Sequence, residues 1–341
     1  MNIRLPAEWE NQDGILLAWP HAASDWHDAL ETVEPVFVAI AREISRFEQV
    51  IIVAPEVELI RARLIEDGVN LQRVRLLPIP TNDTWARDFG PITVFAEDVP
   101  VVLNFGFNAW GLKFAAHLDN QITATLAQSG VFGRCEVRTP GLILEGGSIE
   151  SNGAGTILTT SQCLLHPNRN PHLSRAGIEK ALADLLGASR ILWLEAGYLV
   201  GDDTDAHIDT LARFCPNDTI VYVQCDDPAD EHYPALKTME SELRAFRTPT
   251  GRPYRLVPLP WPRPCYDADG QRLPATYANF LIINGALLVP VYQNDQDIKA
   301  LEILAQVFPN RTVIGINCLP LIHQHGSLHC VTMQIPKGVL Q

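Results

Sequence analysis

Apolar residues recur along the chain with two different spacings, and each spacing predicts a different kind of element. Within residues 25–48 the apolar positions recur at intervals of three and four residues: Leu30, Val33, Phe37, Ile40, Ala41 and Ile44. This spacing is typical of an amphipathic helix. Residues 49–54 follow as a short, mostly apolar run that stops at Pro55, which is typical of a buried strand.

The same order of helix and strand returns further along the chain. Helices are predicted at about 57–67, 174–187, 230–246 and 296–307. Strands are predicted after them, at 73–78, 190–195, 254–259 and 312–316. Two β-hairpins are predicted between these units, because Asn152-Gly153 and Asn284-Gly285 are strong turn signals between apolar runs.

These units of helix, strand and hairpin recur at intervals of roughly 50–70 residues. The recurrence predicts an α/β fold built from a structural repeat, although no sequence repeat is visible. The proline-rich stretch 257–264 is the best candidate for a domain boundary, but strand signals resume soon after it. We therefore interpret this stretch as a stiff surface loop and expect one domain over residues 1–341.

Composition and charge narrow the class of protein. Of the 341 residues, 47% are apolar and 19% are charged, which is typical of a folded globular protein. The chain has 40 acidic and 26 basic residues, and its net charge of −14 disfavours nucleic acid and anionic membranes as partners and favours small cations. No apolar run is long enough to span a membrane, and the first residues lack the apolar core of a secretory signal. We therefore expect a cytoplasmic protein without a membrane partner.

Two upstream segments carry carboxylates in positions that suit a cationic ligand. Asp88 lies just before Gly90-Pro91, where it could form a bidentate pair with a planar guanidinium. A surface pair between Arg87 and Asp88 is the structural alternative. Glu145 precedes two glycines, which would either let the backbone approach a ligand closely or simply form a tight turn.

A third segment places acids on both sides of a histidine. On a strand, alternation would put Asp205, His207 and Asp209 on one face. An imidazole between acids is favoured in its protonated form, which suits a general acid for a leaving amine. A calcium-binding acidic loop or a solvated turn is the alternative interpretation.

Seven cysteines are scattered without a CxxC pair, so neither a zinc ribbon nor a disulfide framework is expected. Cys330 stands apart, because Gly326 and His329 lie close to it in and before the strand-like stretch 327–334. Such neighbours favour a reactive thiol, although an inert core thiol is the commonest state of a cysteine. Cys163 is expected to be an unreactive comparison for Cys330.

A metal site is the competing interpretation of the C-terminal segment. Its candidate ligands are His323, His325, His329 and Cys330, with Asp205, His207 and Asp209 as further donors. The histidines show neither an HExxH pattern nor paired CxxC knuckles, so we expect no metal ligand among them.

Together these segments resemble the agmatine deiminase and bacterial peptidylarginine deiminase family of the guanidine-modifying superfamily. The resemblance covers nearly the whole chain and rests on segments that occur in the family's order: Pro6 to Glu10, Leu17 to Pro20, Trp85 to Pro91, Glu145 to Ser148, Asn152 to Thr160, Thr204 to Asp209, Ala278 to Phe280 and His329 to Pro336. It implies a five-bladed α/β propeller (a pentein) of ββαβ repeats around a central channel.

The resemblance also implies a role for each candidate residue. These roles are nucleophile for Cys330, general acid and then base for His207, guanidinium clamps for Asp88 and Asp209, supporting carboxylate for Glu145, and channel lining for Trp85. Asp203, Glu195 and Asp202 are candidates for binding the distal amine of the substrate by charge alone, and Asp203 is the one that we expect to bind the substrate.

The reaction implied is hydrolysis of the guanidinium of agmatine to N-carbamoylputrescine and ammonia, through a cysteine thiouronium and without a metal or organic cofactor. The partner is a small cationic guanidino substrate, and a homo-oligomer is allowed. Three positions depart from the family pattern: Ala206, residues 324–327 and Met333. They leave open a deiminase of free arginine or peptidylarginine. Two further hypotheses compete with a deiminase: a metal-dependent amidohydrolase, and a non-catalytic binder of guanidino or polyamine ligands.

Overall fold

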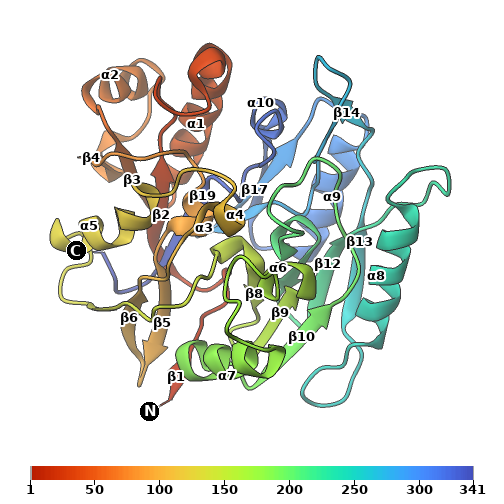
Figure 1. The fold of residues 1–341 in the computed structure, drawn as a ribbon. Coiled ribbons are helices and arrows are strands. Elements are labelled where there is room, and N and C mark those ends of the chain that lie inside the picture. Colours follow the sequence, from red (N-terminus) through yellow and green to blue (C-terminus); the bar gives the residue numbers. More distant parts are fainter. Residues whose placement is uncertain (1, 341) are drawn as a thin grey trace.

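The computed structural model describes residues 2–340, which form five mixed β-sheets of three or four strands and one short two-stranded pair. Each of the five larger sheets combines antiparallel and parallel strand pairs. Helices connect the parallel partners and lie towards the outside of the molecule (Figure 1). The predicted α/β class is therefore confirmed.

One sheet joins the two ends of the chain, in the strand order β19 Thr332–Pro336, β2 Gln12–Ala18, β3 Gln49–Ala54 and β4 Val74–Pro78. The next consists of β1 Ile3–Arg4, β5 Ile92–Ala96, β6 Val99–Leu103 and β7 Glu136–Arg138. Three more follow: β10 Arg190–Leu194, β9 Thr156–Thr160 and β8 Ile149–Ser151; β11 Ala212–Cys215, β12 Thr219–Val223 and β13 Arg255–Leu259; β16 Leu281–Ile283, β17 Ala286–Val291 and β18 Thr312–Asn317. The short pair is β14 Cys265–Tyr266 and β15 Arg272–Leu273.

The longer helices are α1 Leu30–Ser45, α2 Glu58–Glu66, α5 Ile122–Gln128, α7 Arg175–Leu186, α8 Tyr233–Ala245 and α9 Asp297–Val307. Short turns are α3 Ala86–Phe89, α4 Ala109–Leu112, α6 Ser161–Leu164, α10 Leu319–Ile322, η1 His27–Ala29, η2 Leu71–Arg73, η3 Asp119–Gln121, η4 Gly146–Ser148 and η5 Ile208–Thr210. Within residues 2–340, no helix combines the length and the apolar character that crossing a bilayer requires.

The helices, strands and hairpins predicted from apolar spacing are present close to their predicted bounds. The helix expected over residues 25–48 is shorter, because Trp26 turns into the core and its indole donates to Asp83 (2.9 Å) and Thr84 (3.0 Å). The proline-rich stretch is only partly a loop. Its first residues belong to β13, an edge strand, where the missing N–H of Pro258 costs little.

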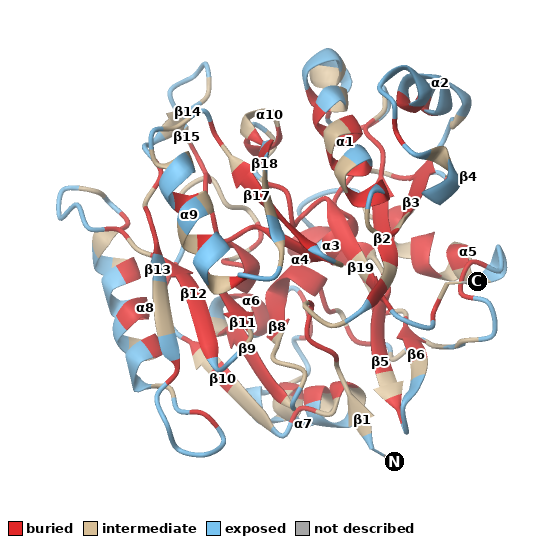
Figure 2. Ribbon diagram, turned by 180° about the vertical axis from the view of Figure 1, so that it is seen from behind, coloured by how far each residue is buried: buried red, intermediate tan, exposed pale blue. Residues whose placement is uncertain are grey.

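Short turns that lead into strands of three different sheets meet inside the molecule. α3 precedes β5, η4 precedes β8 and η5 precedes β11; α3 contacts η4, and η4 contacts η5. The middle of the molecule around α3 is almost entirely buried (Figure 2). Segments far apart in sequence are therefore brought together by turns at strand entrances, rather than by the strands themselves.

Candidate active site

Cys330 lies in a buried turn that leads into β19. The strand expected over residues 327–334 is therefore wrong in its first half and begins only at Thr332. The reason is local, because Thr332 N–H donates back to the carbonyl of His329 (3.1 Å), and the carbonyl of Cys330 accepts from Arg87 N–H (3.1 Å). Cys330 is 6% exposed, and its thiol donates to Oδ1 of Asn279 at 3.4 Å.

A cavity of about 150 Å³ reaches Cys330. Its walls carry acids and aromatic rings: Asp25, Asp83, Asp88, Asp203, Trp85, Trp110 and Phe114. Among the described residues, no lysine or arginine lines this cavity. A small, acidic and aromatic cavity is complementary to a small organic cation.

Gly147 is the point at which three predicted site residues converge. A Cβ atom placed on Gly147 would lie 2.5 Å from Nδ1 of His207, 2.9 Å from Oδ1 of Asp88 and 3.1 Å from Oδ2 of Asp209. Its N–H donates to Oδ1 of Asp88 at 3.0 Å. Only glycine fits here, so the paired glycines after Glu145 admit neighbouring side chains to the site.

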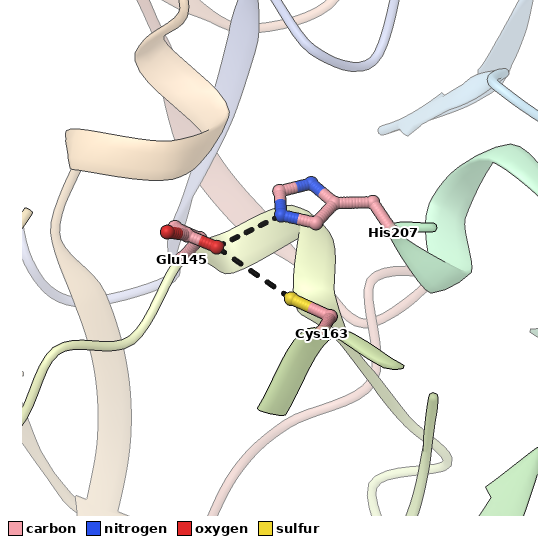
Figure 3. A group of neighbouring side chains, drawn as sticks. All are labelled: Glu145, Cys163 and His207. Atoms are coloured by element: carbon pink, nitrogen blue, oxygen red, sulfur yellow. Dashed lines mark hydrogen bonds and ion pairs between the residues drawn. The ribbon is translucent and has the colours of Figure 1, made fainter. Parts of the chain in front are cut away.

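His207 is buried between two carboxylates. Its Nε2 lies 3.0 Å from Oε2 of Glu145 (Figure 3). Its Nδ1 lies 3.6 Å from Oδ1 of Asp88. Cys163 Sγ donates to the same Glu145 oxygen at 3.6 Å. Burial lowers the pKa of the imidazole, but the charge of Asp88 and the bonds to Cys163 and Glu145 outweigh it and raise that pKa well above its ordinary value. His207 is therefore held as an imidazolium, the form of a general acid.

Arg169 fixes the carboxylate of Glu145. Its Nε lies 2.9 Å from both Glu145 oxygens, and its two other nitrogens donate to Asp205 (2.7 Å) and to the carbonyl of Thr204 (2.8 Å). Burial raises the pKa of Glu145, but His207 and Arg169 together lower it below its ordinary value. The ion pair thus keeps Glu145 charged beside His207 and ties it to the loop that precedes the histidine.

Asp209 is held from behind by the histidine that precedes Cys330. Oδ2 of Asp209 lies 2.7 Å from Nδ1 of His329, whose Nε2 lies 2.7 Å from Glu8, and Glu8 also accepts from Arg213 at 2.8 Å. Within residues 2–340, the second oxygen of Asp209, Oδ1, is buried without a hydrogen-bond partner. Burial raises the pKa of Asp209, but His329 and nearby positive charges bring it below its ordinary value.

The free site holds Cys330 as a thiol. Burial, with the charges of Asp209 and Asp88, raises its pKa well above the ordinary value. Burial also raises the pKa of Asp88 to about 6, although His207 and Trp110 act in the opposite direction. A cation in the cavity would oppose both shifts, because it favours the ionised forms of the thiol and of the carboxyl, so the site is electrostatically suited to a cation.

Asp205, His207 and Asp209 do not lie on one face of a strand, so this expectation is wrong. Asp205 and Ala206 adopt left-handed backbone conformations (φ 67° and 63°), which interrupts the alternation, and residues 208–210 form η5. Asp205 turns towards Lys113 (2.9 Å) and Arg169, away from the cavity.

The metal site built on three histidines is not assembled in the described part of the chain. His325 Nδ1 bonds the carbonyl of Gly201 (2.8 Å), whereas His329 faces Glu8. The groups close enough to share an ion are Glu145, Cys163 and His207, and separately Glu8, Glu150 and His329. In both groups an arginine already forms an ion pair with a carboxylate: Arg169 with Glu145, and Arg213 with Glu8.

Of the residues predicted to contact the substrate, Trp85, Asp88 and Asp203 line the cavity, whereas Asp209 is not among its lining residues. Trp85 packs so closely on Gly326 that a Cβ there would lie 2.1 Å from its ring. Glu195 does not reach the cavity, since it is exposed and pairs with Arg175 (2.5 Å). Asp202 turns to the loop and bonds Thr204 and the N–H of Ala206.

Several site residues were not predicted from the sequence. Asp25, Asp83 and Trp110 line the cavity, Asn279 contacts the thiol, and Arg169 holds Glu145. Asn279 offered one signal, because it falls in a segment that matches the family pattern, just before a predicted hairpin. The others carry no local pattern that separates them from ordinary surface or core residues.

The chain is similar to known deiminases over nearly its whole length. The family model of the Porphyromonas-type peptidyl-arginine deiminases matches residues 4–336. The agmatine deiminase of Pseudomonas aeruginosa strain LESB58 is 34% identical, over 98% of this chain and 95% of the relative.

Solved structures are similar over the whole length. A Porphyromonas gingivalis protein, provisionally assigned as an arginine deiminase, is 50% identical with a TM-score of 0.95, covering 99% of this chain and 100% of that chain. The agmatine deiminase of C. jejuni with substrate bound is 39% identical with a TM-score of 0.91, covering 99% and 97%.

Proposed function

We propose that this chain, which belongs to the Porphyromonas-type peptidyl-arginine deiminase family, is an agmatine deiminase. It hydrolyses the guanidinium of agmatine to N-carbamoylputrescine and ammonia. The observation that carries the proposal is the acidic cavity that ends at Cys330 and shares Asp88 with the cluster around Gly147.

The charge of the cavity favours agmatine over free arginine. Agmatine carries a cation at each end, whereas arginine carries a carboxylate beside its amine. Asp203, Asp25 and Asp83 line the cavity together with Asp88. They attract a distal ammonium and repel a carboxylate. Asp203 is the proposed contact of the distal amine, and Trp85 packs against the connecting methylenes.

Asp88 and Asp209 are the proposed clamps of the guanidinium. Asp88 accepts from Gly147 N–H at Oδ1 and from the Trp110 indole at Oδ2, whereas Asp209 is held only at Oδ2, by His329. The unpartnered Oδ1 of Asp209 is left to accept from the planar fork of N–H donors. Fixing the plane of the guanidinium supplies proximity and orientation for attack on its carbon.

Substrate binding activates the nucleophile. The thiol pKa of Cys330 is raised by burial and by two carboxylates, and a guanidinium between those carboxylates neutralises their charge. The thiol then gives its proton to solvent water, and the thiolate attacks the guanidinium carbon. His207 protonates the departing nitrogen, which leaves as ammonia and gives an S-alkylthiouronium on Cys330.

The second half of the reaction reverses the role of His207. Having given its proton to the leaving nitrogen, it accepts one from a water molecule, and the resulting hydroxide attacks the thiouronium carbon. The C–S bond breaks as the hydroxyl proton of the tetrahedral adduct passes to the sulfur, which restores the thiol of Cys330, and the ureido product leaves. Glu145 stabilises the imidazolium in both halves, because it is held charged by Arg169 at hydrogen-bond distance from His207.

The five larger sheets are the proposed blades of a five-bladed α/β propeller. Each combines an antiparallel pair with a parallel pair joined by helix, as ββαβ units require. The turns that lead into the blades then line the channel. We also propose that residues 1–341 form one catalytic domain.

The test is a substrate panel. The purified protein is incubated with agmatine, free arginine, a peptidylarginine and N-carbamoylputrescine, and both ammonia and ureido product are measured. We expect equal amounts of both from agmatine and little from the others. Turnover of arginine or peptidylarginine in preference to agmatine would reassign the substrate, and no product from any guanidino compound would refute deiminase activity.

A further inference from the structure

The segment α4, Ala109–Leu112, is a turn of left-handed helix at the wall of the cavity. Its four residues have φ values of 51°, 55°, 88° and 71°. This conformation is disfavoured for every residue except glycine, and only Gly111 is a glycine. Single residues adopt it in turns, but runs of them are rare, so the surroundings must enforce it.

Side chains on both flanks enforce the turn. Asn108 accepts from the N–H of Gly111 (3.0 Å) and donates to the carbonyl of Asn168 (2.8 Å), while Asn168 donates to the carbonyl of Gly111 (3.1 Å). Lys113 follows the turn and bonds Asp205 (2.9 Å). The turn is therefore anchored to two other segments of the site.

The turn presents Trp110 to the proposed clamp. Its indole Nε1 donates to Oδ2 of Asp88 at 2.9 Å, and its side chain is buried and lines the cavity. Phe107 and Phe114 pack edge-on against the ring, with centroids 5.2 Å and 5.7 Å away. Together with Gly147 N–H, the indole gives each oxygen of Asp88 one fixed donor and leaves one lone pair of each for a ligand.

We propose that Trp110 is the positioning residue of Asp88, and that the left-handed turn serves to aim its indole N–H at that carboxylate. This inference rests on the proposed function, because it takes Asp88 as a guanidinium clamp. A right-handed or extended backbone at these residues would direct the Trp110 side chain differently. The strained conformation is therefore kept at the point where the Asp88 carboxylate must be held.

The first test is Trp110→Phe, which keeps an aromatic wall and removes the donor. We expect kcat/KM for agmatine to fall by about 10- to 100-fold, the usual range for a hydrogen bond to a charged group. The acid limb of kcat/KM should also move to higher pH, because the lost bond favoured the ionised form of Asp88. The other groups that face Asp88 are His207, Glu145, Asp209 and Cys330, and all of them remain.

The matched control is Phe107→Leu, which removes packing on Trp110 and keeps its N–H. Its acid limb should stay at the wild-type pH. A Trp110→Phe variant with wild-type kcat/KM and an unmoved limb would overturn the inference. The same shift in Phe107→Leu would also overturn it, because packing rather than the hydrogen bond would then be the cause.

The strained turn is tested without any assay of activity. Leu112 is 75% exposed, so changes there remove little packing. Asparagine tolerates the left-handed region and a β-branched residue does not. The melting temperature of the Leu112→Asn variant should therefore be roughly 1–3 °C higher than that of the Leu112→Val variant. Equal melting temperatures, or the reverse order, would refute the backbone strain that the turn is inferred to hold.

One measurement separates this inference from the proposed function. The rate at which iodoacetamide alkylates Cys330 depends on the charge of Asp88 and needs no turnover. If the wild-type protein releases no ammonia from any guanidino compound, the proposed function fails. A pH profile of alkylation that shifts in Trp110→Phe and not in Phe107→Leu would then still support Trp110 as the positioning residue, and unshifted profiles in both would refute it.

Discussion

At the scale of single residues, the two proposed clamps are held by donors of different chemistry. Asp88 is bonded by the neutral indole of Trp110 and by the backbone of Gly147. Asp209 is bonded by His329, which is itself tied to Glu8. Burial raises the pKa of Asp88 to about 6, whereas His329 and other positive charges overcome burial and lower that of Asp209. Asp209 therefore stays charged under conditions in which Asp88 titrates.

His329 bonds Asp209 through Nδ1 and Glu8 through Nε2, so two substitutions that each keep one of these bonds should have unequal effects. Asparagine places an amide near the position of Nδ1 and can still donate to Asp209, whereas glutamine reaches the position of Nε2 and contacts Glu8 instead. We expect His329→Asn to retain more kcat/KM than His329→Gln, by about 10-fold or more if the bond to Asp209 behaves as one to a charged group. Steady-state kinetics of both variants, with circular dichroism to verify folding, measures this. Equal losses in the two variants would show that the bond to Asp209 is unimportant.

The site residues could be predicted where the sequence clusters acids, histidine or cysteine. The side chains that hydrogen-bond to these residues could not be predicted. Asp88, Glu145, His207 and Cys330 were all predicted as site residues, and the structure places them in one connected group. The link from His329 to Glu8 joins positions 321 apart, and no local pattern encodes it. Cys163 is expected to be unreactive, and no sequence signal predicted its contact with Glu145.

At the scale of elements, the loop before His207 depends on a residue that departs from the family pattern. Ala206 is buried and left-handed (φ 63°), with its N–H bonded to Asp202 and its carbonyl to Thr160. Glycine there would relieve about 1 kcal/mol of strain. It would also lose about 0.8 kcal/mol of methyl burial and add flexibility to the unfolded chain. Alanine is therefore nearly as good as glycine at this position.

We accordingly expect Ala206→Gly to change the free energy of unfolding by less than about 1 kcal/mol. Ala206→Val should lower it by about 2 kcal/mol or more, because a branched side chain is both overpacked and strongly disfavoured at this φ. Denaturant unfolding of the two variants measures the difference. A strongly stabilising glycine would show that the buried methyl contributes little.

Helices and strands were well predicted because their apolar spacing reflects burial against the sheets. α7 and α8 lie within a few residues of their expected bounds. The failures are turns: residues 205–209 and 327–331 were expected to be extended, and α4 was not anticipated. Left-handed residues such as Ala206 and Trp110 have no sequence signal, because tertiary contacts impose their conformation.

At the scale of the whole molecule, strands from the two ends of the chain pair in one sheet. β19, which follows Cys330, pairs antiparallel with β2, and β2 follows Glu8 within a few residues. The nucleophile and the support of Asp209 therefore reach the site only when the two ends of the chain are paired. Apolar periodicity could predict the elements, but not this pairing.

The net charge of −14 predicts a dependence on ionic strength. An acidic molecule attracts a cationic substrate towards its cavity. Salt weakens this attraction, because at 0.1 M ionic strength charges more than about 10 Å apart in solvent are largely screened. We expect kcat/KM for agmatine to fall several-fold between low salt and about 0.5 M NaCl while kcat changes little. Steady-state kinetics across the salt series measures this. A kcat/KM that is independent of salt would exclude long-range steering.

The central claim is that Cys330 attacks the guanidinium carbon, and trapping the intermediate tests it most directly. Wild-type protein turning over agmatine is quenched with acid, digested and analysed by peptide mass spectrometry. The account predicts that the peptide containing Cys330 gains the mass of agmatine less that of ammonia, while peptides with the other cysteines, including Cys163, are unmodified. Ammonia release without this adduct, or the same adduct on another cysteine, would contradict the account.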